Sequence, residues 1–329
     1  MKGVGETMTR GSTRRRPGPP ELVSFADISI DVVVRVSRLP RRDEKESATL
    51  VGEFPGGMGA NVAAAFVTLG GSAALVSSIG NDERGRQSLA DLQAIGVDVG
   101  HVVTTEDSTF WTLALLDAQG EKSLVEFSTQ ASSPQWDQIE WSLLDGAKVA
   151  YTVGAEGRHA CRLFYECRER GITTALDIES ADLADEPTLR TLLKQTDVLF
   201  APARYAQAIA QTGSLRKAAG SLLAAGPSVV AITRGNRGCL VASPHDLIEV
   251  PGYLVPVVDT TGAGDCFAGA FLYAFVRGWP VRDCAQVANL MAAQSVTAYG
   301  CRGHLPNLAQ LAELPEAADL SILRKTTSE

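Results

Sequence analysis

The chain has 329 residues, of which 45% are hydrophobic, and its formal net charge at pH 7 is -8. This composition predicts a globular protein with a large core, and its acidic balance argues against nucleic acid as a partner. No run of about 18 apolar residues occurs, so we expect no membrane partner. The six cysteines form no C-x-x-C pair, which indicates reduced thiols in a cytoplasmic protein.

The two ends of the chain differ from its middle. Residues 1–20 are rich in Gly, Arg, Pro and Thr and contain no apolar segment of the kind found in secretion signals. They are predicted to form a disordered tail. We expect one folded domain over residues 21–320 and a short C-terminal tail over residues 321–329.

The first folded segment contains a buried strand within residues 21–34, interrupted by Asp27 and Asp31. A carboxylate near the carboxyl end of a buried strand either contacts a ligand or caps a turn. Residues 35–53 are polar and charged, with a short strand at Ala48–Val51. They are expected to form an exposed flap.

A glycine-led helix follows the flap. It begins in Gly56-Gly57-Met58-Gly59-Ala60-Asn61, is rich in alanine and ends at Gly70. The glycine spacing matches neither the dinucleotide-binding fingerprint nor the Walker phosphate loop. Asn61 lies in the first turn, where its side chain could face the hydroxyl groups of a ligand.

The next segments change from an α/β pattern to a hairpin. A strand over residues 73–79 and a helix over residues 85–95 come first. Residues 110–118 and 123–128 then predict a β-hairpin with a Gln-Gly turn. Because this hairpin breaks the α/β pattern, we expect it outside the main sheet, beside the flap.

Strands and helices alternate regularly in the second half of the chain. This alternation predicts a mostly parallel sheet with helices on both faces. The expected strands are 149–153, 173–177, 197–200, 228–233, 239–242, 246–250 and 253–258, and the expected helices are 159–170, 188–195, 215–225, 266–276 and 281–298.

Two glycine-containing turns in this half are candidates for ligand binding. The segment Val258–Asp265 leads from the last expected strand into a buried helix, and the free N–H groups of such a helix start bind anions. Asp265 either complements the helix dipole or acts as a base beside the anion. The turn Thr233–Gly238 either only connects two strands or lines a nucleotide pocket.

Together these motifs resemble the ribokinase family, the phosphofructokinase-B-type carbohydrate kinases, over residues 21–306. Asp259-Thr260-Thr261-Gly262-Ala263-Gly264-Asp265 is similar to the C-terminal signature of that family. The glycine motif at residues 56–61, the segment Asp27–Asp31 and the turn at residues 233–238 resemble its other motifs. The resemblance implies a three-layer α/β sandwich with a small β lid, whose segments span roughly residues 32–55 and 108–130.

The resemblance also implies a reaction: ATP- and Mg²⁺-dependent phosphorylation of a hydroxyl on a small carbohydrate. Asp265 would be the general base, and the N–H groups of Gly262, Ala263 and Gly264 would form the anion hole. The remaining implied site residues fall into three groups. They are Asp31, Gly57 and Asn61 for the acceptor, Thr233, Gly235, Gly238 and Asn289 for the nucleotide, and Asp259, Thr261, Ser295 and Gly300 for a monovalent cation such as K⁺.

The chain departs from the family pattern at two places. Pro202 and Tyr205 replace the Asn and Glu that serve phosphate and magnesium in many members, and Met58 replaces a common lysine. Asp177 or Glu179 could substitute through water. Gly154–Arg158 resembles a segment of the ketohexokinase branch, which favours a ketose acceptor.

Three functions follow from these observations. The first is a sugar kinase, the second a nucleoside kinase of the same fold, and the third a non-catalytic sugar-binding protein. The resemblance also implies a homodimer formed through the lid.

Overall fold

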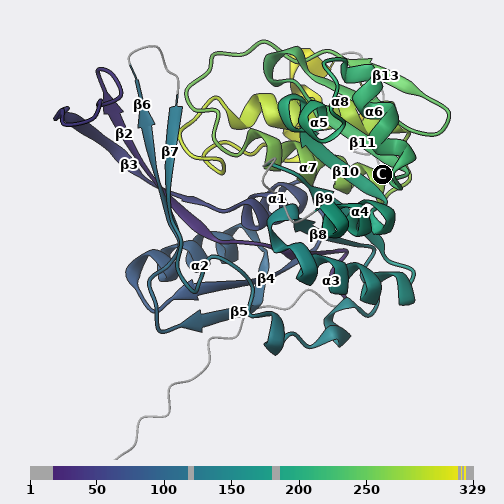
Figure 1. Cartoon of the computed structure of the whole chain (residues 1–329), viewed down its shortest axis with the longest axis horizontal. Helices are drawn as coiled ribbons and strands as arrows, with labels where there is room; N and C mark the ends of the chain where they lie inside the picture. The colour runs from purple at the N-terminus through teal and green to yellow at the C-terminus, as the bar shows by residue number, and fades with distance from the viewer. Residues whose placement is uncertain (1–17, 118–121, 180–185, 318–319, 321, 324–329) are drawn as a thin grey trace, which may run out of the picture.

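A nine-stranded sheet forms the centre of the molecule in the computed structural model, which describes residues 18–117, 122–179, 186–317, 320 and 322–323 (Figure 1). Its order is β13-β12-β11-β10-β9-β8-β1-β4-β5, and all neighbours are parallel except β11-β12 and β12-β13. The strands are β1 (Leu22–Phe25), β4 (Ala73–Gly80), β5 (Asp98–Thr105), β8 (Val149–Val153), β9 (Thr173–Asp177), β10 (Val198–Pro202), β11 (Val229–Thr233), β12 (Cys239–Ala242) and β13 (Leu247–Val250).

Helices cover both faces of this sheet, and both faces are apolar. Along β8, Val149, Tyr151 and Val153 belong to one core and Ala150 to the other. The first core is covered by α1 (Met58–Thr68), α2 (Glu83–Ile95), α7 (Ala263–Phe275), α8 (Val281–Ser295) and α9 (Leu308–Glu313). The second is covered by α3 (Gly157–Glu169), α4 (Glu186–Gln195), α5 (Ala203–Ile209) and α6 (Leu215–Ala224).

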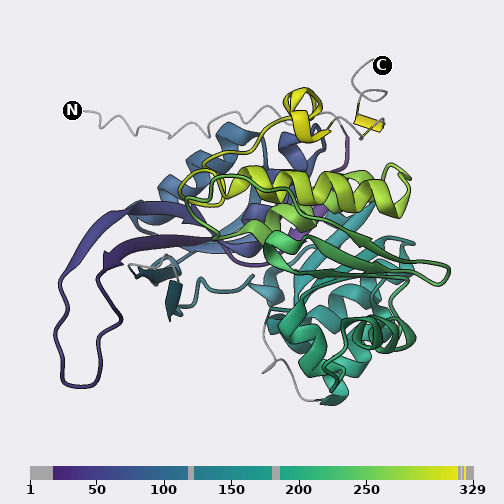
Figure 2. The ribbon, with the colours of Figure 1, turned by 90° about the horizontal axis from the view of Figure 1, so that it is seen from above.

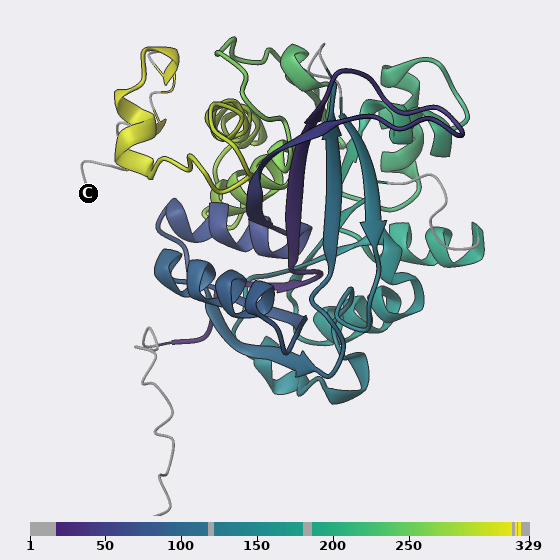
Figure 3. The ribbon, with the colours of Figure 1, turned by 90° about the vertical axis from the view of Figure 1, so that its left-hand side faces the viewer.

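A second sheet of four strands stands apart from the three layers. We call it the lid sheet. Its order is β3-β2-β6-β7, formed by β2 (Ser29–Val36), β3 (Ala48–Gly56), β6 (Trp111–Leu116) and β7 (Lys122–Phe127). Figure 2 shows β2 and β3 reaching out from the body of the molecule, and in Figure 3 the lid sheet faces the viewer.

Short 3₁₀ helices connect several of these elements. They are η1 (Trp136–Gln138), η2 (Trp141–Leu144), η3 (Gly154–Glu156), η4 (Gly235–Arg237) and η5 (Pro315–Ala317). No helix within the described residues has both the length and the apolar character needed to cross a membrane.

The predicted three-layer fold and the small lid sheet are confirmed, and three local predictions are corrected. The first strand is two strands in different sheets, because the chain leaves β1 at Ala26 and enters β2 at Ser29. The polar flap supplies a full strand, β3, and residues 98–105 and 203–209 form an additional strand and helix. The predicted tail over residues 1–17 lies outside the described residues.

The predicted strand over residues 253–258 is wrong, because this segment is not paired in a sheet. Pro251 and Pro256 have no N–H group for a ladder. The N–H groups of Val258 and Asp259 instead donate to the carbonyl oxygen of Val296, at 2.8 and 3.2 Å. The turn before α7 is therefore held by the end of α8.

Candidate active site

A cavity of about 670 Å³ opens between the lid sheet and the carboxyl ends of the central strands. Asp27 follows β1, Glu156 follows β8, Glu179 follows β9, and Thr233 ends β11, and all four residues line the cavity. Ligands of α/β proteins bind at this end of a parallel sheet. The fold thus gathers polar side chains from distant parts of the sequence at one place.

The glycine turn before α7 forms one wall of the cavity. Gly262 has a φ of 71° and is the N-cap of α7, and Gly262, Ala263, Gly264 and Asp265 all line the cavity. A Cβ on Gly262 would lie 2.3 Å from the side chain of Cys301, so only glycine fits here. The N–H groups of a first helical turn have no acceptor within the helix and attract anions.

The start of α1 meets this turn from the other side. Nδ2 of Asn61 donates to Oδ2 of Asp265 at 2.7 Å, and both side chains are buried. Oδ1 of Asn61 is buried and has no partner among the described residues, although Asn61 lines the cavity. Gly57 has a φ of 98°, and its backbone lines the same cavity. A ligand hydroxyl could donate to the unpaired Asn61 oxygen.

Asp31 enters the cavity from the lid sheet. It lies on β2, and its carboxylate accepts a hydrogen bond from the Thr112 hydroxyl on β6. Burial raises the pKa of Asp31, while hydrogen bonding from Thr112 and the charge of Lys122 oppose this. Asp31 is thus held in one orientation, with only 7% of its surface exposed.

Carboxylates outnumber basic groups among the charged side chains that line the cavity. The acidic residues that line it are Asp27, Asp31, Glu126, Glu156, Asp177, Glu179 and Asp265. Burial, followed by the charge of Glu179, raises the pKa of Asp265 well above its ordinary value, and hydrogen bonding from Asn61 lowers it. Burial likewise raises the pKa of Asp177 and of Glu179. A carboxylate with a raised pKa is a stronger base.

Two basic side chains line the same cavity, and sequence reasoning missed both. Lys122 begins β7, and its Nζ lies 3.3 Å from Oγ1 of Thr261 in the glycine turn. Arg204 lies at the start of α5, and its charge, like that of Lys122, lowers the pKa of Glu179. Lys122 and Thr261 are 139 positions apart, so no sequence pattern connects them. Glu156 belongs to the segment that resembles the ketohexokinase branch, but it was not predicted as a site residue. Its carboxylate accepts hydrogen bonds from Ser133 and Trp136 at 2.8 and 2.7 Å.

Both departures from the family pattern lie in the cavity. Its lining includes Pro202, Tyr205 and Met58, and none of these three offers a carboxylate or an amide side chain. Asp177 and Glu179 line it as well, next to Asp265. Within the described residues, no group of three or more His, Cys, Asp or Glu side chains is arranged to hold a metal ion. Mg²⁺ commonly binds through one or two carboxylates, water and substrate phosphates, and this donor set fits that mode.

The predicted nucleotide residues divide into two groups. Thr233 lines the cavity, whereas Gly235, Gly238 and Asn289 are not part of its lining. The amide of Asn289 donates to the carbonyl oxygens of Val250 and Pro251, at 3.3 and 3.0 Å. Asn289 thus holds the end of β13, and a direct role in nucleotide binding stays a prediction.

The predicted cation residues lie behind the glycine turn. Oδ1 of Asp259 accepts from the N–H of Thr261 at 2.9 Å, and Oδ2 accepts from the N–H of Gly300 at 3.0 Å. Ser295 ends α8 and is buried beside the Val296 carbonyl that Asp259 contacts. Asp259 therefore ties the glycine turn to the loop after α8.

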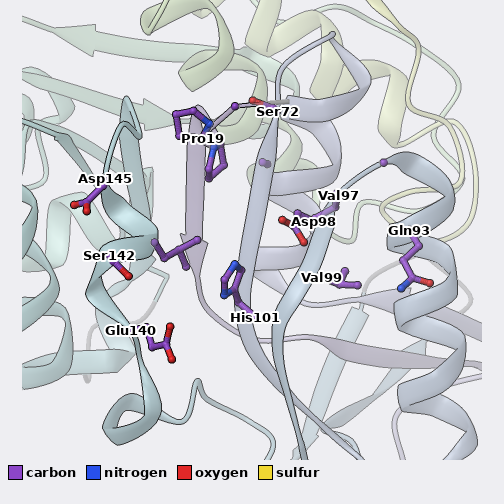
Figure 4. Close-up of a pocket in the computed structure, with 15 residues that line it drawn as sticks. Pro19, Ser72, Gln93, Val97, Asp98, Val99, His101, Glu140, Ser142 and Asp145 are labelled. Carbon is purple, nitrogen blue, oxygen red and sulfur yellow. The ribbon is translucent and has the colours of Figure 1, made fainter. Parts of the chain in front are cut away.

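A second cavity, of about 660 Å³, lies at the opposite end of the sheet (Figure 4). It is lined by Ser72, Asp98 and Ser142, which precede or begin the strands β4, β5 and β8. None of the predicted site residues lines it. Its size matches that of the first cavity, but the glycine turns and the carboxylate cluster distinguish the first as the candidate active site.

Comparisons with known proteins identify the family of the chain. A profile of the pfkB family of carbohydrate kinases matches residues 19–308. The chain is 29% identical to an ATP-dependent ribose-1-phosphate kinase from Halopiger xanaduensis, over 85% of this chain and 93% of that protein. It is 26% identical to the ribokinase of Bacillus subtilis, over 87% of this chain and 96% of that protein.

A solved structure shows the same fold. Arabidopsis thaliana ribokinase, determined with ribose and ATP, superposes with a TM-score of 0.76 at 22% identity, covering 90% of this chain and 98% of that protein. The family resemblance inferred from the motifs is confirmed, as is the prediction of a carbohydrate kinase. This chain belongs to the pfkB family of carbohydrate kinases.

Proposed function

We propose that the protein transfers the terminal phosphoryl group of ATP to a hydroxyl of a small sugar, with Asp265 as the general base. The contact between Asn61 and Asp265 carries this proposal, because it fixes a buried carboxylate beside both the glycine turn and a free acceptor atom. Phosphoryl transfer depends mainly on positioning and electrostatics. The described cavity supplies both.

The acceptor hydroxyl binds between Asp265, Asn61 and Asp31. Asp265 takes the hydroxyl proton as the new P–O bond forms, and the N–H groups of residues 262–264 stabilise the charge on the transferring group. Asp31, oriented by Thr112, holds further hydroxyls of the sugar. These positions lie on three separate elements, β2, α1 and α7, that meet at the cavity.

ATP brings several negative charges into a cavity whose lining includes seven acidic residues and only two basic ones, so cations must accompany it. Mg²⁺ neutralises charge on the phosphates when bound, and Asp177 and Glu179 are the residues that would hold it, through water. Lys122 and Arg204 provide the fixed positive charge of this chain. Lys122 reaches the glycine turn from the lid sheet, which places its charge beside the proposed phosphate site.

The aromatic content of the cavity favours a sugar over a nucleoside. Trp111 does not line the cavity, because its ring stacks on Phe127 at 3.8 Å between ring centroids and lies under the Arg84 guanidinium. Phe110 lines the cavity from the lid side. Of Phe110 and Trp111, only Phe110 is therefore available to stack on a base, and Tyr205 is the other aromatic residue in the cavity lining.

An acceptor panel tests the proposal. ADP release is measured with ATP, Mg²⁺ and K⁺ against ribose, fructose and ribose 1-phosphate in one arm, and adenosine, inosine and pseudouridine in the other. Turnover in the sugar arm supports a sugar kinase, and turnover only in the nucleoside arm makes the chain a nucleoside kinase. Ligand binding without ADP release in either arm would identify a non-catalytic member.

A homodimer through the lid sheet is supported by its outer face. Asp31, Thr112 and Glu126 are register partners that face the cavity, so their neighbours Val32, Leu113 and Val125 face away from it. Leu50, Val125 and Phe127 on this face are 61%, 45% and 38% exposed. Sedimentation should show a dimer, and Leu50→Glu should weaken it, whereas Leu247→Glu, at a leucine on β13 that is 40% exposed, should not.

Two further expectations belong to the same proposal. The loops joined by Asp259 would hold a monovalent cation, and replacing K⁺ with Na⁺ in the assay tests this. The described structure contains six free cysteines and no disulfide, which supports a cytoplasmic location. Fractionation of cells that express the tagged protein tests the location.

A further inference from the structure

Two cysteines meet directly behind the glycine turn. Sγ of Cys266 lies 3.2 Å from Sγ of Cys301, and both side chains are fully buried. Cys266 follows Asp265 in α7, and Cys301 follows Gly300 in the loop after α8. A disulfide bond needs the sulfur atoms about 2.05 Å apart. These two sulfurs therefore need to approach each other by only about 1 Å.

The same two cysteines contact the backbone of the turn. The Cys301 thiol donates to the carbonyl oxygen of Gly262 at 3.2 Å, and the N–H of Cys266 donates to that oxygen at 3.0 Å. A Cβ on Gly262 would meet Cβ and Sγ of Cys301 at 2.3 Å, so the turn packs tightly on this side chain. Any displacement of the Cys301 sulfur is transmitted to Gly262.

We infer that Cys266 and Cys301 form a reversible disulfide that lowers the activity of the enzyme, an inference that rests on the proposed role of the glycine turn. With hydrogen peroxide as the oxidant, one thiol becomes a sulfenic acid and releases water. The second thiol attacks that sulfur, forms the S–S bond and releases a second water molecule. The Gly262 carbonyl then loses its thiol donor, and the sulfur shifts toward α7. The anion hole is displaced as a result.

The surroundings determine how the pair responds. Burial raises the pKa of the Cys301 thiol well above its ordinary value, and thiols in this protonated form react slowly. The pair is therefore expected to oxidise slowly, under sustained exposure to the oxidant. Cys167, Cys239 and Cys284 are also buried, while Cys161 is the one cysteine with intermediate exposure. Cys161 would compete for the oxidant at the surface.

The test uses the Cys161→Ser variant as the starting protein, so that the most exposed thiol is absent. The reduced protein is treated with hydrogen peroxide, quenched, and assayed for its initial rate and for disulfide-linked peptides. We expect a peptide that joins residues 266 and 301, with the mass of two hydrogen atoms removed. The rate should fall about tenfold or more and return after reduction with dithiothreitol.

Two further variants complete the experiment. Adding Cys284→Ser, which replaces another buried cysteine, should leave both the linked peptide and the loss of rate intact. Adding Cys301→Ser should abolish the link. After treatment with hydrogen peroxide, this variant should keep the rate that it had before treatment. The inference is overturned if no link forms, if it forms with the rate unchanged, or if the Cys301→Ser protein loses its rate equally. A linked peptide in a protein that phosphorylates no acceptor supports the disulfide site and overturns only the proposed function.

Discussion

Nδ2 of Asn61 lies 2.7 Å from Oδ2 of Asp265, although the two residues are 204 positions apart. This contact joins the start of α1 to the start of α7, and each helix follows a glycine with a positive φ. It leaves Oδ1 of the Asn61 amide unpaired within the described structure. The pair thus fixes the orientation of the proposed base and offers an acceptor for the substrate hydroxyl.

Removing the Asn61 amide should weaken the enzyme and alter its pH dependence. We expect Asn61→Ala to lower kcat/KM by about ten- to a hundredfold, since a hydrogen bond to a charged group is lost. The Asn61 hydrogen bond lowers the pKa of Asp265, so its loss raises that pKa. Because activity requires ionised Asp265, the acidic limb of the pH–rate profile should move to higher pH. A limb that stays in place would contradict this role.

Neutralising Glu179 should move the acidic limb of the pH–rate profile to lower pH. The charge of Glu179 raises the pKa of Asp265, second only to burial. In Glu179→Gln, Asp265 should ionise at lower pH, and the acidic limb should shift accordingly. A general loss of structure would not shift the pH–rate profiles of Glu179→Gln and Asn61→Ala in opposite directions, so opposite shifts would exclude that explanation.

Lys122 should matter through its positive charge. In Lys122→Met the cation that lies 3.3 Å from Thr261 is lost, and kcat should fall about ten- to a hundredfold. Lys122→Arg, which keeps the charge, should recover part of the loss. Lys217→Met removes an exposed lysine on α6 and serves as the matched control, with no expected effect. Equal rates for Lys122→Met and Lys217→Met would show that Lys122 does not contribute to catalysis.

Asp27 should make the stability of the fold depend on pH. Its carboxylate accepts from the N–H of Met58 at 3.0 Å, and burial raises its pKa from 3.8 to about 7. The folded state therefore binds a proton that the unfolded state releases above pH 3.8, so stability falls as the pH rises through 7. The effect is on the order of 4 kcal/mol at most.

Asp27→Asn removes this titration while retaining an acceptor for Met58. Urea unfolding of both proteins at pH 5 and pH 8 measures the difference. The free energy of unfolding of the wild type should drop between the two pH values by more than that of Asp27→Asn. Equal drops in the two proteins would show that Asp27 is not the titrating group.

Much of the site could be predicted because its residues lie in short local patterns. The glycines and Asp265 occur together at a helix start, where both the backbone N–H groups and a carboxylate have a clear chemical use. Gly57 and Asn61 follow the same logic at α1. The fold class followed from the alternation of apolar strands and helices.

Other features depend on contacts between distant segments. Lys122 reaches Thr261 only because β7 joins the lid sheet, and Cys266 meets Cys301 only because α7 and the end of α8 are neighbours. The segment at residues 253–258 is apolar enough for a strand, yet Leu254 is 83% exposed, and two prolines limit its pairing. Local sequence patterns do not determine these long-range contacts or whether an apolar segment pairs in a sheet.

The rate of ADP release by Asp265→Asn tests the central claim most directly. The measurement uses the best acceptor from the panel, with Asp246→Asn, an exposed carboxylate before β13, as the matched control. We expect Asp265→Asn to lower kcat by about a hundredfold or more while still binding ATP, and Asp246→Asn to match the wild type. A fully active Asp265→Asn protein would contradict the assignment of Asp265 as the general base.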